Sequence, residues 1–398
     1  MDTTITPETV EPTLGFDPTS AGFRRNPYPY YERLRAEAPV HLSAFGFWTV
    51  ARYDDVAHML KTPEVFSSAG MGGATMVGSG SARSIITSDP PAHTQMRNLV
   101  NRAFTPRMVA DLEPSIREIA RDLIDAVIAA GQMDVVRDLA VPLPVIVISR
   151  ILGVDASRRD DFKRWSSAFI SQFQGAGEGA ARDREEFLAY FREQIDERRA
   201  RPKDDLISAL VAAEDADVAL TPDEVAGFAM LLLVAGNETT TNLIGNAMLA
   251  LLEHPDQLAA VAGDAMLIPN MVEETLRYDA PVQFLFRRTT QETQLAGQTI
   301  PAANVVVPIF ASANRDDARY PDAARFDITR NAQGHLAFGL GPHFCLGAPL
   351  ARLEARIVFE ELFSRTRNIA RKEDAPPARI DSMFLRGLSA LPVTFDRA

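Results

Sequence analysis

Apolar residues along most of the chain recur every three to four positions, the spacing that places them on one face of a helix. The pattern begins early and continues past the middle of the chain, with three interruptions. It predicts helices over 27–38, over 54–61 and over most of 93–278, with breaks near 131–141, 174–180 and 214–221. Most of the chain should therefore be helical.

Apolar and polar residues alternate instead in a few short stretches, as expected for strands with one buried face. These stretches lie near 40–55, 282–310 and 379–395, whereas 311–337 follows neither period. No composition shift, repeat or linker-like segment divides the 398 residues. We expect a single domain over 1–398, mainly α with a minor β portion.

The longest apolar run follows a strong helix start. Thr221-Pro222-Asp223-Glu224 has the form of a capping box with proline at the first helical position. Inside the helix, Ala235-Gly236-Asn237-Glu238-Thr239-Thr240 places an acid and two hydroxyls where they cost stability. Such residues indicate either a functional site or a packing notch in which the polar groups are satisfied.

The only cysteine, Cys345, lies in a glycine-rich loop from Phe338 to Gly347. Leucine and isoleucine return at helical spacing after it, so Cys345 should lie at a helix N-terminus. The helix dipole and free N–H groups there lower a thiol pKa, and such a thiolate can ligate heme iron. A buried structural cysteine is the alternative. One cysteine and six scattered histidines do not give the spacing of zinc ligands.

The segment Phe338-Gly339-Leu340-Gly341-Pro342-His343-Phe344-Cys345-Leu346-Gly347 resembles the heme-binding signature of the cytochrome P-450 superfamily. The resemblance extends to three further motifs, in the family's order, between 89 and 347. It implies the cytochrome P-450 fold, a triangular helical domain with a small β-sheet region. It also implies heme b, with Cys345 as the iron ligand and Phe338, Gly339, His343 and Gly347 as cofactor-binding residues.

In this family the long buried helix binds oxygen, and Ala235-Gly236-Asn237-Glu238-Thr239 matches its motif. The resemblance implies that the small residues Ala235 and Gly236 leave room for O₂ beside the heme. It also implies that Glu238 and Thr239 are catalytic, because a carboxylate and a hydroxyl at this place can feed protons to the oxygen.

Heme carries two propionates, and the resemblance assigns their binding to histidine and arginine. His93 and Arg97 are four residues apart and share one face of a predicted helix. Arg287 occupies the position of the family's strand arginine, whereas Arg288 should point to the opposite face. His343 completes the set, and all four chosen side chains can donate to a carboxylate.

A Glu-x-x-Arg motif of the family matches Glu274 and Arg277. In the family a third residue joins this pair, and Arg325 in Pro321-Asp322-Ala323-Ala324-Arg325-Phe326 fits its position. The resemblance implies that the three side chains form a buried salt-bridge cluster behind the heme. Removing one partner would leave an uncompensated buried charge, so the cluster should serve folding and heme retention.

The same resemblance places the substrate among apolar segments. The implied lining residues are Met71, Met76, Leu232, Val282, Phe284, Leu285, Met383 and Phe384. Taken singly, each of them reads as an ordinary core residue. Together they predict a mid-sized hydrophobic substrate, namely a terpenoid, a steroid, a fatty acid or a macrolide-like compound.

The net charge of −12 argues against nucleic acid as a partner. The N-terminus has neither the basic nor the apolar region of a signal peptide, and the longest apolar stretch, 225–236, is too short to span a bilayer. We therefore expect a cytoplasmic monomer without a membrane anchor.

The sequence contains no flavin or nicotinamide fingerprint, so electrons should come from a separate ferredoxin or flavodoxin-type donor with its reductase. Arg102, Arg107, Arg352 and Arg356 are a candidate basic patch for this donor, with ordinary solvated arginines as the alternative. The leading function is O₂-dependent hydroxylation or epoxidation. The alternatives are a heme-binding sensor or carrier, a non-heme helical binding protein, and desaturation or oxidative coupling by the same heme.

Overall fold

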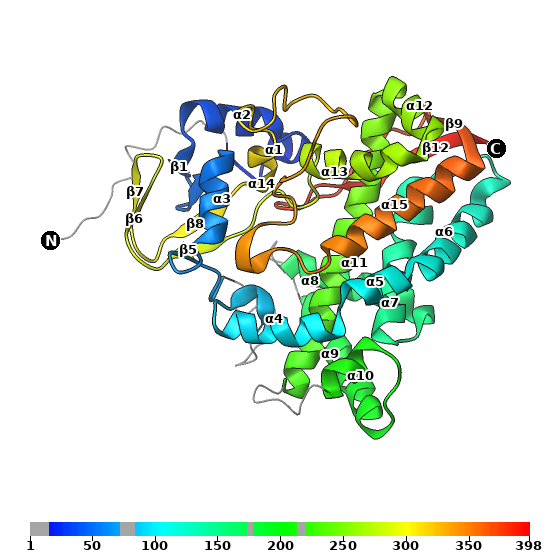
Figure 1. Cartoon of the computed structure of the whole chain (residues 1–398), viewed down its shortest axis with the longest axis horizontal. Helices are drawn as coiled ribbons and strands as arrows, with labels where there is room; N and C mark the ends of the chain where they lie inside the picture. Colours follow the sequence, from blue (N-terminus) through cyan, green and yellow to red (C-terminus); the bar gives the residue numbers. More distant parts are fainter. Residues whose placement is uncertain (1–15, 72–83, 173–177, 213–219) are drawn as a thin grey trace.

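The computed structural model describes residues 16–71, 84–172, 178–212 and 220–398. Figure 1 shows a roughly triangular body with helices over most of its width, many of the short strands toward one side, and C-terminal strands near the opposite side. The helices are α1 (Ala21–Arg25), α2 (Tyr28–Glu37), α3 (Tyr53–Lys61), α4 (Ala92–Ala103), α5 (Pro106–Asp111), α6 (Glu113–Ile128), α7 (Pro142–Leu152), α8 (Arg159–Gln172), α9 (Glu178–Ala200), α10 (Leu206–Ala212), α11 (Pro222–Glu253), α12 (Pro255–Gly263), α13 (Ile268–Tyr278), α14 (Phe310–Ala313) and α15 (Ala348–Arg365). The strands are β1 (Val40–Leu42), β2 (Trp48–Val50), β3 (Phe66–Ser67), β4 (Gln132–Asp134), β5 (Arg287–Thr289), β6 (Thr293–Leu295), β7 (Gln298–Ile300), β8 (Val305–Pro308), β9 (Thr366–Arg371), β10 (Ala378–Arg379), β11 (Leu388–Ala390) and β12 (Pro392–Arg397). The predicted mainly α fold with a minor β portion is confirmed.

The long helix α11 crosses the middle of the body (Figure 1) and begins where the sequence predicts. Thr221 Oγ1 accepts a hydrogen bond from the Glu224 N–H at 3.2 Å, and the Glu224 carboxylate accepts one from the Thr221 N–H at 2.8 Å. Helices α7, α8, α9, α13 and α15 pack around α11. Because most of its side chains are buried, the polar residues along α11 must find partners inside the protein.

Five short strands form the main sheet in the order β1-β2-β8-β5-β3. Every pair is antiparallel except β2 and β8, where Trp48 lies opposite Val306. Alternation along β5 buries Arg287 and exposes Arg288, as predicted. At the edge strand β3, the Ser67 hydroxyl bonds the Asp89 carboxylate just before α4. The sheet thus brings Arg287 and the start of α4 to the same region.

A second sheet, in the order β4-β12-β9, joins the predicted break near 131–141 to the C-terminal strand. The remainder of that break is a short π-helix, η4 (Val135–Ala140). Strands β3, β4 and β9 lie outside the predicted strand ranges. Strands β3 and β4 are too short to show a period, and β9 does not alternate between buried and exposed residues. The local pattern therefore does not mark them.

Buried apolar side chains form two clusters. The larger surrounds α11 and α15, and the smaller lies between the main sheet and α3. The loop that holds Cys345 lies between them, because Phe338 packs against the larger cluster and Leu340 against the smaller one. The loop is therefore packed between the two clusters.

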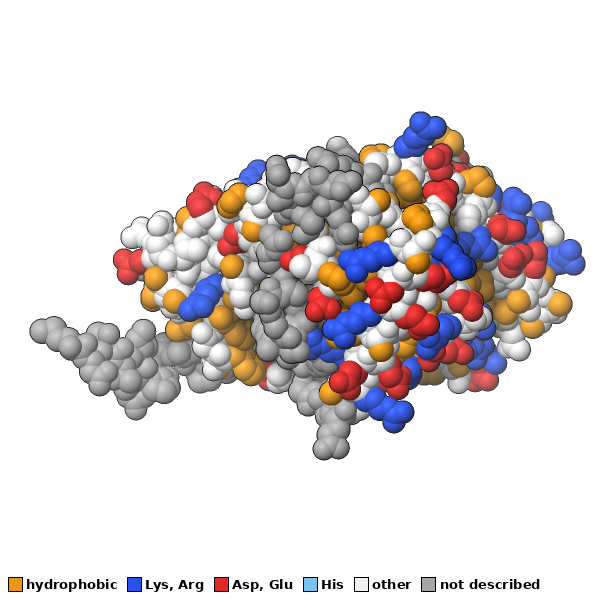
Figure 2. Space-filling view, turned by 90° about the horizontal axis from the view of Figure 1, so that it is seen from below, with side chains coloured by type: hydrophobic (Ala, Val, Ile, Leu, Met, Phe, Trp, Pro, Cys, Tyr) orange, Lys and Arg blue, Asp and Glu red, His pale blue; other side chains and the backbone are white. Residues whose placement is uncertain are grey.

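Within the part of the chain that the structure describes, no helix is long and apolar enough to cross a membrane. Figure 2 shows acidic and basic side chains interspersed over much of one face. Many of them are paired, as between α6 and α15, where Arg117 Nη1 lies 2.8 Å from Glu361 Oε1. Opposite charges are thus mixed on this surface rather than separated.

Candidate active site

The cysteine loop requires glycine at position 341 for a steric reason. Gly341 has a φ of +73°, and a Cβ there would lie 2.2 Å from the Leu60 carbonyl oxygen at the end of α3. No other residue fits this close approach without displacing backbone. The Cys345 N–H closes the loop by donating to the Phe338 carbonyl at 2.8 Å. The loop shape therefore depends on contact with α3 as well as on its own sequence.

Cys345 lies just before α15, as predicted, but the expected direction of its pKa shift is wrong for the protein alone. Burial raises the pKa of the Cys345 thiol above its ordinary value. The backbone N–H groups of Gly347 and Ala348 and the charges of Arg97 and Arg352 act in the opposite direction but do not outweigh burial. The helix N-terminus thus favours a thiolate, but a positive partner is needed to complete the shift.

Arg352 fastens the cysteine loop to α13. Its guanidinium donates to the Glu273 carboxylate at 2.5 and 2.9 Å and lies 4.6 Å from the centre of the Phe338 ring. His335 Nε2 lies 3.2 Å from the same carboxylate. Burial raises the pKa of Glu273, but the hydrogen bonds from His335 and Arg352 outweigh it and leave the pKa at about 2. Phe338 is thereby held beside the loop that it begins.

His93 and His343 are brought together, as the resemblance implies. Their ring centres are 4.2 Å apart. Both ring nitrogens of His93 and Nε2 of His343 are buried without a hydrogen-bond partner among the described residues. Burial and the positive charge of Arg287 lower the pKa of His343 to about 3. These nitrogens are polar groups without the partners that buried polar groups normally have.

Two arginines flank the histidines, and Arg287 is buried whereas Arg97 is half-buried. Burial lowers the pKa of Arg287 to about 10, and its guanidinium donates to the Phe286 carbonyl at 2.8 Å. Arg97 donates to the Pro342 carbonyl at 3.2 Å. Neither guanidinium forms an ion pair within the described parts of the chain. The nearby Asp89 carboxylate is already engaged by Ser67 and by the Ser68 N–H.

Buried cations without counter-ions are costly, so this place is suited to an anionic ligand. Two arginines and two histidines with free donors match the two carboxylates of a heme. The thiol of Cys345 lies on the loop that carries His343, in reach of the charge of Arg97. The residues present therefore fit a heme bound through its propionates and ligated by sulfur.

The face of α11 that the family would place over heme keeps accessible surface. Ala235 is exposed, and Leu232 and Thr239, three and four residues away, are half-buried. Thr239 Oγ1 donates to the Ala235 carbonyl at 2.5 Å, one helical turn back. A Cβ at Gly236 would meet only Ile148 Cδ1 of α7, at 4.0 Å, so the space beside this residue is otherwise open. Ala235 adds exposed surface on this part of α11.

Glu238 is buried and has a partner that the sequence did not reveal. Lys163 Nζ from α8 lies 2.5 Å from Glu238 Oε1. The Glu238 side chain is 10% exposed and that of Lys163 is 35% exposed, so the pair connects the interior with the surface. The two residues are 75 positions apart, and neither the periodicity nor any motif relates them.

Glu354 on α15 is a second buried acid that the sequence reading missed. Burial raises its pKa to about 8, against a hydrogen bond with Thr240 on α11. Thr240 follows Thr239, so this carboxyl lies behind the helix segment that carries the proposed catalytic residues. A signal was present, since Glu354 interrupts the buried apolar positions of α15.

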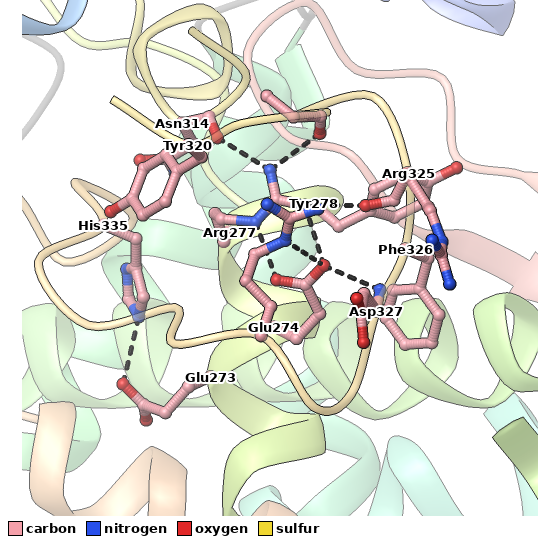
Figure 3. A network of polar contacts seen from close by, with 12 residues as sticks. Glu273, Glu274, Arg277, Tyr278, Asn314, Tyr320, Arg325, Phe326, Asp327 and His335 are labelled. Carbon is pink, nitrogen blue, oxygen red and sulfur yellow. Dashed lines mark hydrogen bonds and ion pairs between the residues drawn. The ribbon is translucent and has the colours of Figure 1, made fainter. Parts of the chain in front are cut away.

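The predicted salt-bridge cluster exists, with one correction (Figure 3). Arg277 donates to both oxygens of Glu274, at 2.7 and 2.8 Å, and both side chains are fully buried. Arg325 contributes only its backbone carbonyl, 3.0 Å from Arg277 Nη2, and is itself exposed. The second cation at Glu274 is Arg330, at 3.5 Å. The turn after Phe326 directs Arg330 inward, a detail that the motif does not encode.

The predicted pocket residues divide into two groups. Phe284 is fully buried in the core, with its ring centre 5.7 Å from that of Phe16, so it does not line a pocket. Met76 lies outside the described residues. The others keep partial exposure: Met71, Leu232, Val282, Leu285, Met383 and Phe384.

The candidate basic patch is not a set of free cations. Arg352 is paired with Glu273, and Arg356 lies 2.7 Å from Glu113 and 2.8 Å from Glu360. Arg107 is highly exposed, with Asp111 at 3.9 Å. The side chain of Arg102 lies outside the described residues. Arg352 and Arg356 thus join α15 to α13 and to α6, whereas Arg107 pairs only within α5.

The loop with Cys345, the cluster of His93, Arg97, Arg287 and His343, and the accessible face of α11 together fit a heme-thiolate protein. The family model described as Cytochrome P450 matches residues 145–394. The chain is 42% identical to the cytochrome P450 monooxygenase PikC of Streptomyces venezuelae, over 97% of this chain and 95% of that protein. It therefore belongs to the cytochrome P450 family, is a heme-dependent monooxygenase, and is not a non-heme binding protein or a sensor without turnover.

Solved structures agree. The structure of CYP109Q5 from Chondromyces apiculatus has a TM-score of 0.90 and 45% identity, and the match covers 97% of this chain and 100% of that chain. CYP109E1 from Bacillus megaterium, solved in complex with testosterone, has a TM-score of 0.87 and 38% identity, covering 94% of this chain and 99% of that chain. The cytochrome P450 fold is thus confirmed.

Proposed function

We propose that this monooxygenase hydroxylates or epoxidises a mid-sized hydrophobic molecule of the terpenoid, steroid, fatty acid or macrolide-like kind. We further propose that it takes electrons from a separate ferredoxin system. The heme assignment rests on His93, Arg97, Arg287 and His343 beside the Cys345 loop: three histidine ring nitrogens lack a hydrogen-bond partner, and neither guanidinium has an anionic partner among the described residues.

A heme with a thiolate ligand supplies the chemistry that activates O₂. The residues of this chain would hold and orient it. Cys345 ligates the iron, and the Gly347 and Ala348 N–H groups stabilise the charge on its sulfur. Arg97 and Arg287 neutralise the propionates, while His93 and His343 donate hydrogen bonds to them. Each of these residues gains a partner that it lacks within the protein alone.

Glu238 and Thr239 would move protons. Thr239 lies on the accessible face of α11, and its hydroxyl could turn from the Ala235 carbonyl to donate a proton into the space beside the helix. Glu238, one residue earlier, is joined through Lys163 to the protein surface. The pair therefore connects solvent with the place where protons are needed.

The partly exposed pocket side chains support the substrate class. Leu232, Val282, Leu285, Met383 and Phe384 carry no charge, so burying an ionised group among them would be costly. A neutral, largely apolar molecule satisfies this lining. Because CYP109E1 was solved with testosterone, steroids are the first class to test.

A titration of the ferric Soret band with steroids, terpenoids, fatty acids and macrolides tests the proposal. A shift from low to high spin means that the compound displaces water from the iron and enters the pocket. We expect it with at least one of these four classes, followed by an oxygenated product when a ferredoxin system is supplied. A shift with none of them, in protein that holds thiolate-ligated heme, would refute the pocket assignment. Dehydrogenated or coupled products would identify desaturation or oxidative coupling instead.

A further inference from the structure

Two segments that carry proposed pocket residues are joined side by side. The Gln283 N–H donates to the Phe384 carbonyl at 2.8 Å, and the Arg386 N–H donates to the Pro281 carbonyl at 2.8 Å. An antiparallel bridge pairs Val282 with Leu385 between these bonds. The turn that presents Met383 and Phe384 is therefore fixed to the segment that presents Val282 and Leu285.

A buried ion pair anchors the end of this turn. Arg386 Nε lies 2.6 Å from Asp279 Oδ1, and the side chains are 8% and 9% exposed. The Tyr28 hydroxyl donates to the same oxygen at 2.6 Å, and Arg379 Nη1 lies 3.8 Å from Oδ2. Arg386 also donates to the Arg25 carbonyl at 3.1 Å. One guanidinium thus joins the C-terminal turn to the end of α13 and to the end of α1.

The anchor is also connected to α11. Asn246 Nδ2 donates to the Asp279 and Arg386 carbonyls, both at 3.0 Å. Asn246 follows Thr239 by two helical turns on the same helix. The position of the turn relative to the catalytic segment of α11 is therefore set by direct hydrogen bonds and not by apolar packing alone.

We propose that Arg386 is a positioning residue that sets where Met383 and Phe384 meet the substrate, and so determines which substrate carbon is oxidised. This inference rests on the proposed function. Lysine cannot replace the arginine fully, because its single ammonium cannot reach the carboxylate and the Arg25 carbonyl with a planar fork. With Lys at this position the charge of Asp279 stays compensated, but the turn loses part of its fixed geometry.

The test compares Arg386→Lys with a matched control, Arg198→Lys. Arg198 is also a buried arginine paired with an aspartate, Asp205 at 2.8 Å, and it donates to the Gly153 carbonyl. It lies on α9, and its bonds hold neighbouring helices rather than the C-terminal turn. Both variants should lose similar thermal stability, so a general loss of stability affects both equally.

The holoenzymes are compared by heme content and by the reduced carbon monoxide spectrum. They are also titrated with the compound that gives the largest spin shift in the wild type, and the amounts of product oxygenated at each carbon are compared. For Arg386→Lys we expect normal heme ligation, about fivefold or greater weakening of substrate binding and a changed product ratio. The control should keep the wild-type affinity and ratio. Wild-type affinity and product ratio in Arg386→Lys, or an equal change in the control, would overturn the inference.

If Arg386→Lys does not retain heme, Tyr28→Phe decides the question. It removes only the hydroxyl that bonds Asp279 and keeps the ring against Arg315, 3.4 Å away. A smaller change of the product ratio in the same assay supports the inference, and an unchanged ratio refutes it. Failure of the proposed function is separate, because it would appear in the wild type as absent thiolate-ligated heme or absent product.

Discussion

The buried ion pair of Glu274 and Arg277 allows a direct test of its contribution to stability and to heme retention. Replacing Arg277 by Met keeps much of the side-chain length but removes the guanidinium. The change abolishes two bonds to Glu274, at 2.7 and 2.8 Å, and the bonds to the carbonyls of Asn314, Ala323 and Arg325. Glu274 keeps the Asp327 N–H at 2.9 Å and the more distant Arg330 at 3.5 Å.

The expected loss is large. Removing one partner of a fully buried ion pair costs about 3–5 kcal/mol, because the remaining charge is uncompensated. Whole domains are stable by only about 5–15 kcal/mol. Arg277→Met should therefore remove a third or more of the free energy of unfolding, and most of the purified protein should lack heme.

The assay is urea unfolding together with heme content, and Arg325→Ala is the control. The Arg325 side chain is exposed and only its carbonyl is used, so the control should stay within about 0.5 kcal/mol of the wild type. A loss below about 1 kcal/mol in Arg277→Met would refute the assigned role of the pair. An equal loss in Arg325→Ala would restore the three-side-chain cluster and contradict the exposure of Arg325.

Three further predictions follow from buried groups and close contacts. The folded protein holds the Glu354 proton more tightly than the unfolded chain, so the free energy of unfolding should fall as pH rises from 4.5 to about 8, by about 3 kcal/mol at pH 7. Glu354→Gln should remove this pH dependence. If urea unfolding of the variant showed the wild-type pH profile, the prediction would be contradicted. Gly341→Ala should abolish heme loading and lower the unfolding temperature because its Cβ clashes with α3. Gly236→Ala should instead raise the free energy of unfolding by up to about 1 kcal/mol. A higher unfolding temperature for Gly341→Ala than for Gly236→Ala would disprove both assignments. Thr239→Ala should lower the product formed per electron pair about tenfold, with hydrogen peroxide released instead. Lys163→Met should lower this ratio to a smaller extent. A wild-type ratio of product to electrons in Thr239→Ala would exclude the proton role.

Much of the fold and site could be predicted where the chemistry is local. The capping box at Thr221 and Glu224, the helix after Cys345, and the burial of Arg287 against the exposure of Arg288 all depend on neighbours within a few residues. The resemblance added the pairing of His93 with His343, which no local pattern contains.

The remaining features depend on partners remote in the sequence. Glu238 meets Lys163 across 75 positions, and Arg386 meets Asp279 across 107. The errors have the same origin. Arg325 and Arg330 both follow the family segment, and only the three-dimensional path of the chain decides which one points inward. Phe284 lies between the partly exposed Val282 and Leu285, and its contact with Phe16 shows that it belongs to the core.

The most direct test of the account is the absorption spectrum of the reduced, carbon monoxide-bound protein, recorded for the wild type and for Cys345→Ser. The account predicts a thiolate-type Soret band in the wild type, displaced to longer wavelength than that of ordinary heme proteins, and its loss in the variant. A wild-type band without this displacement, or the same displaced band in Cys345→Ser, would contradict the assignment of Cys345 as the iron ligand.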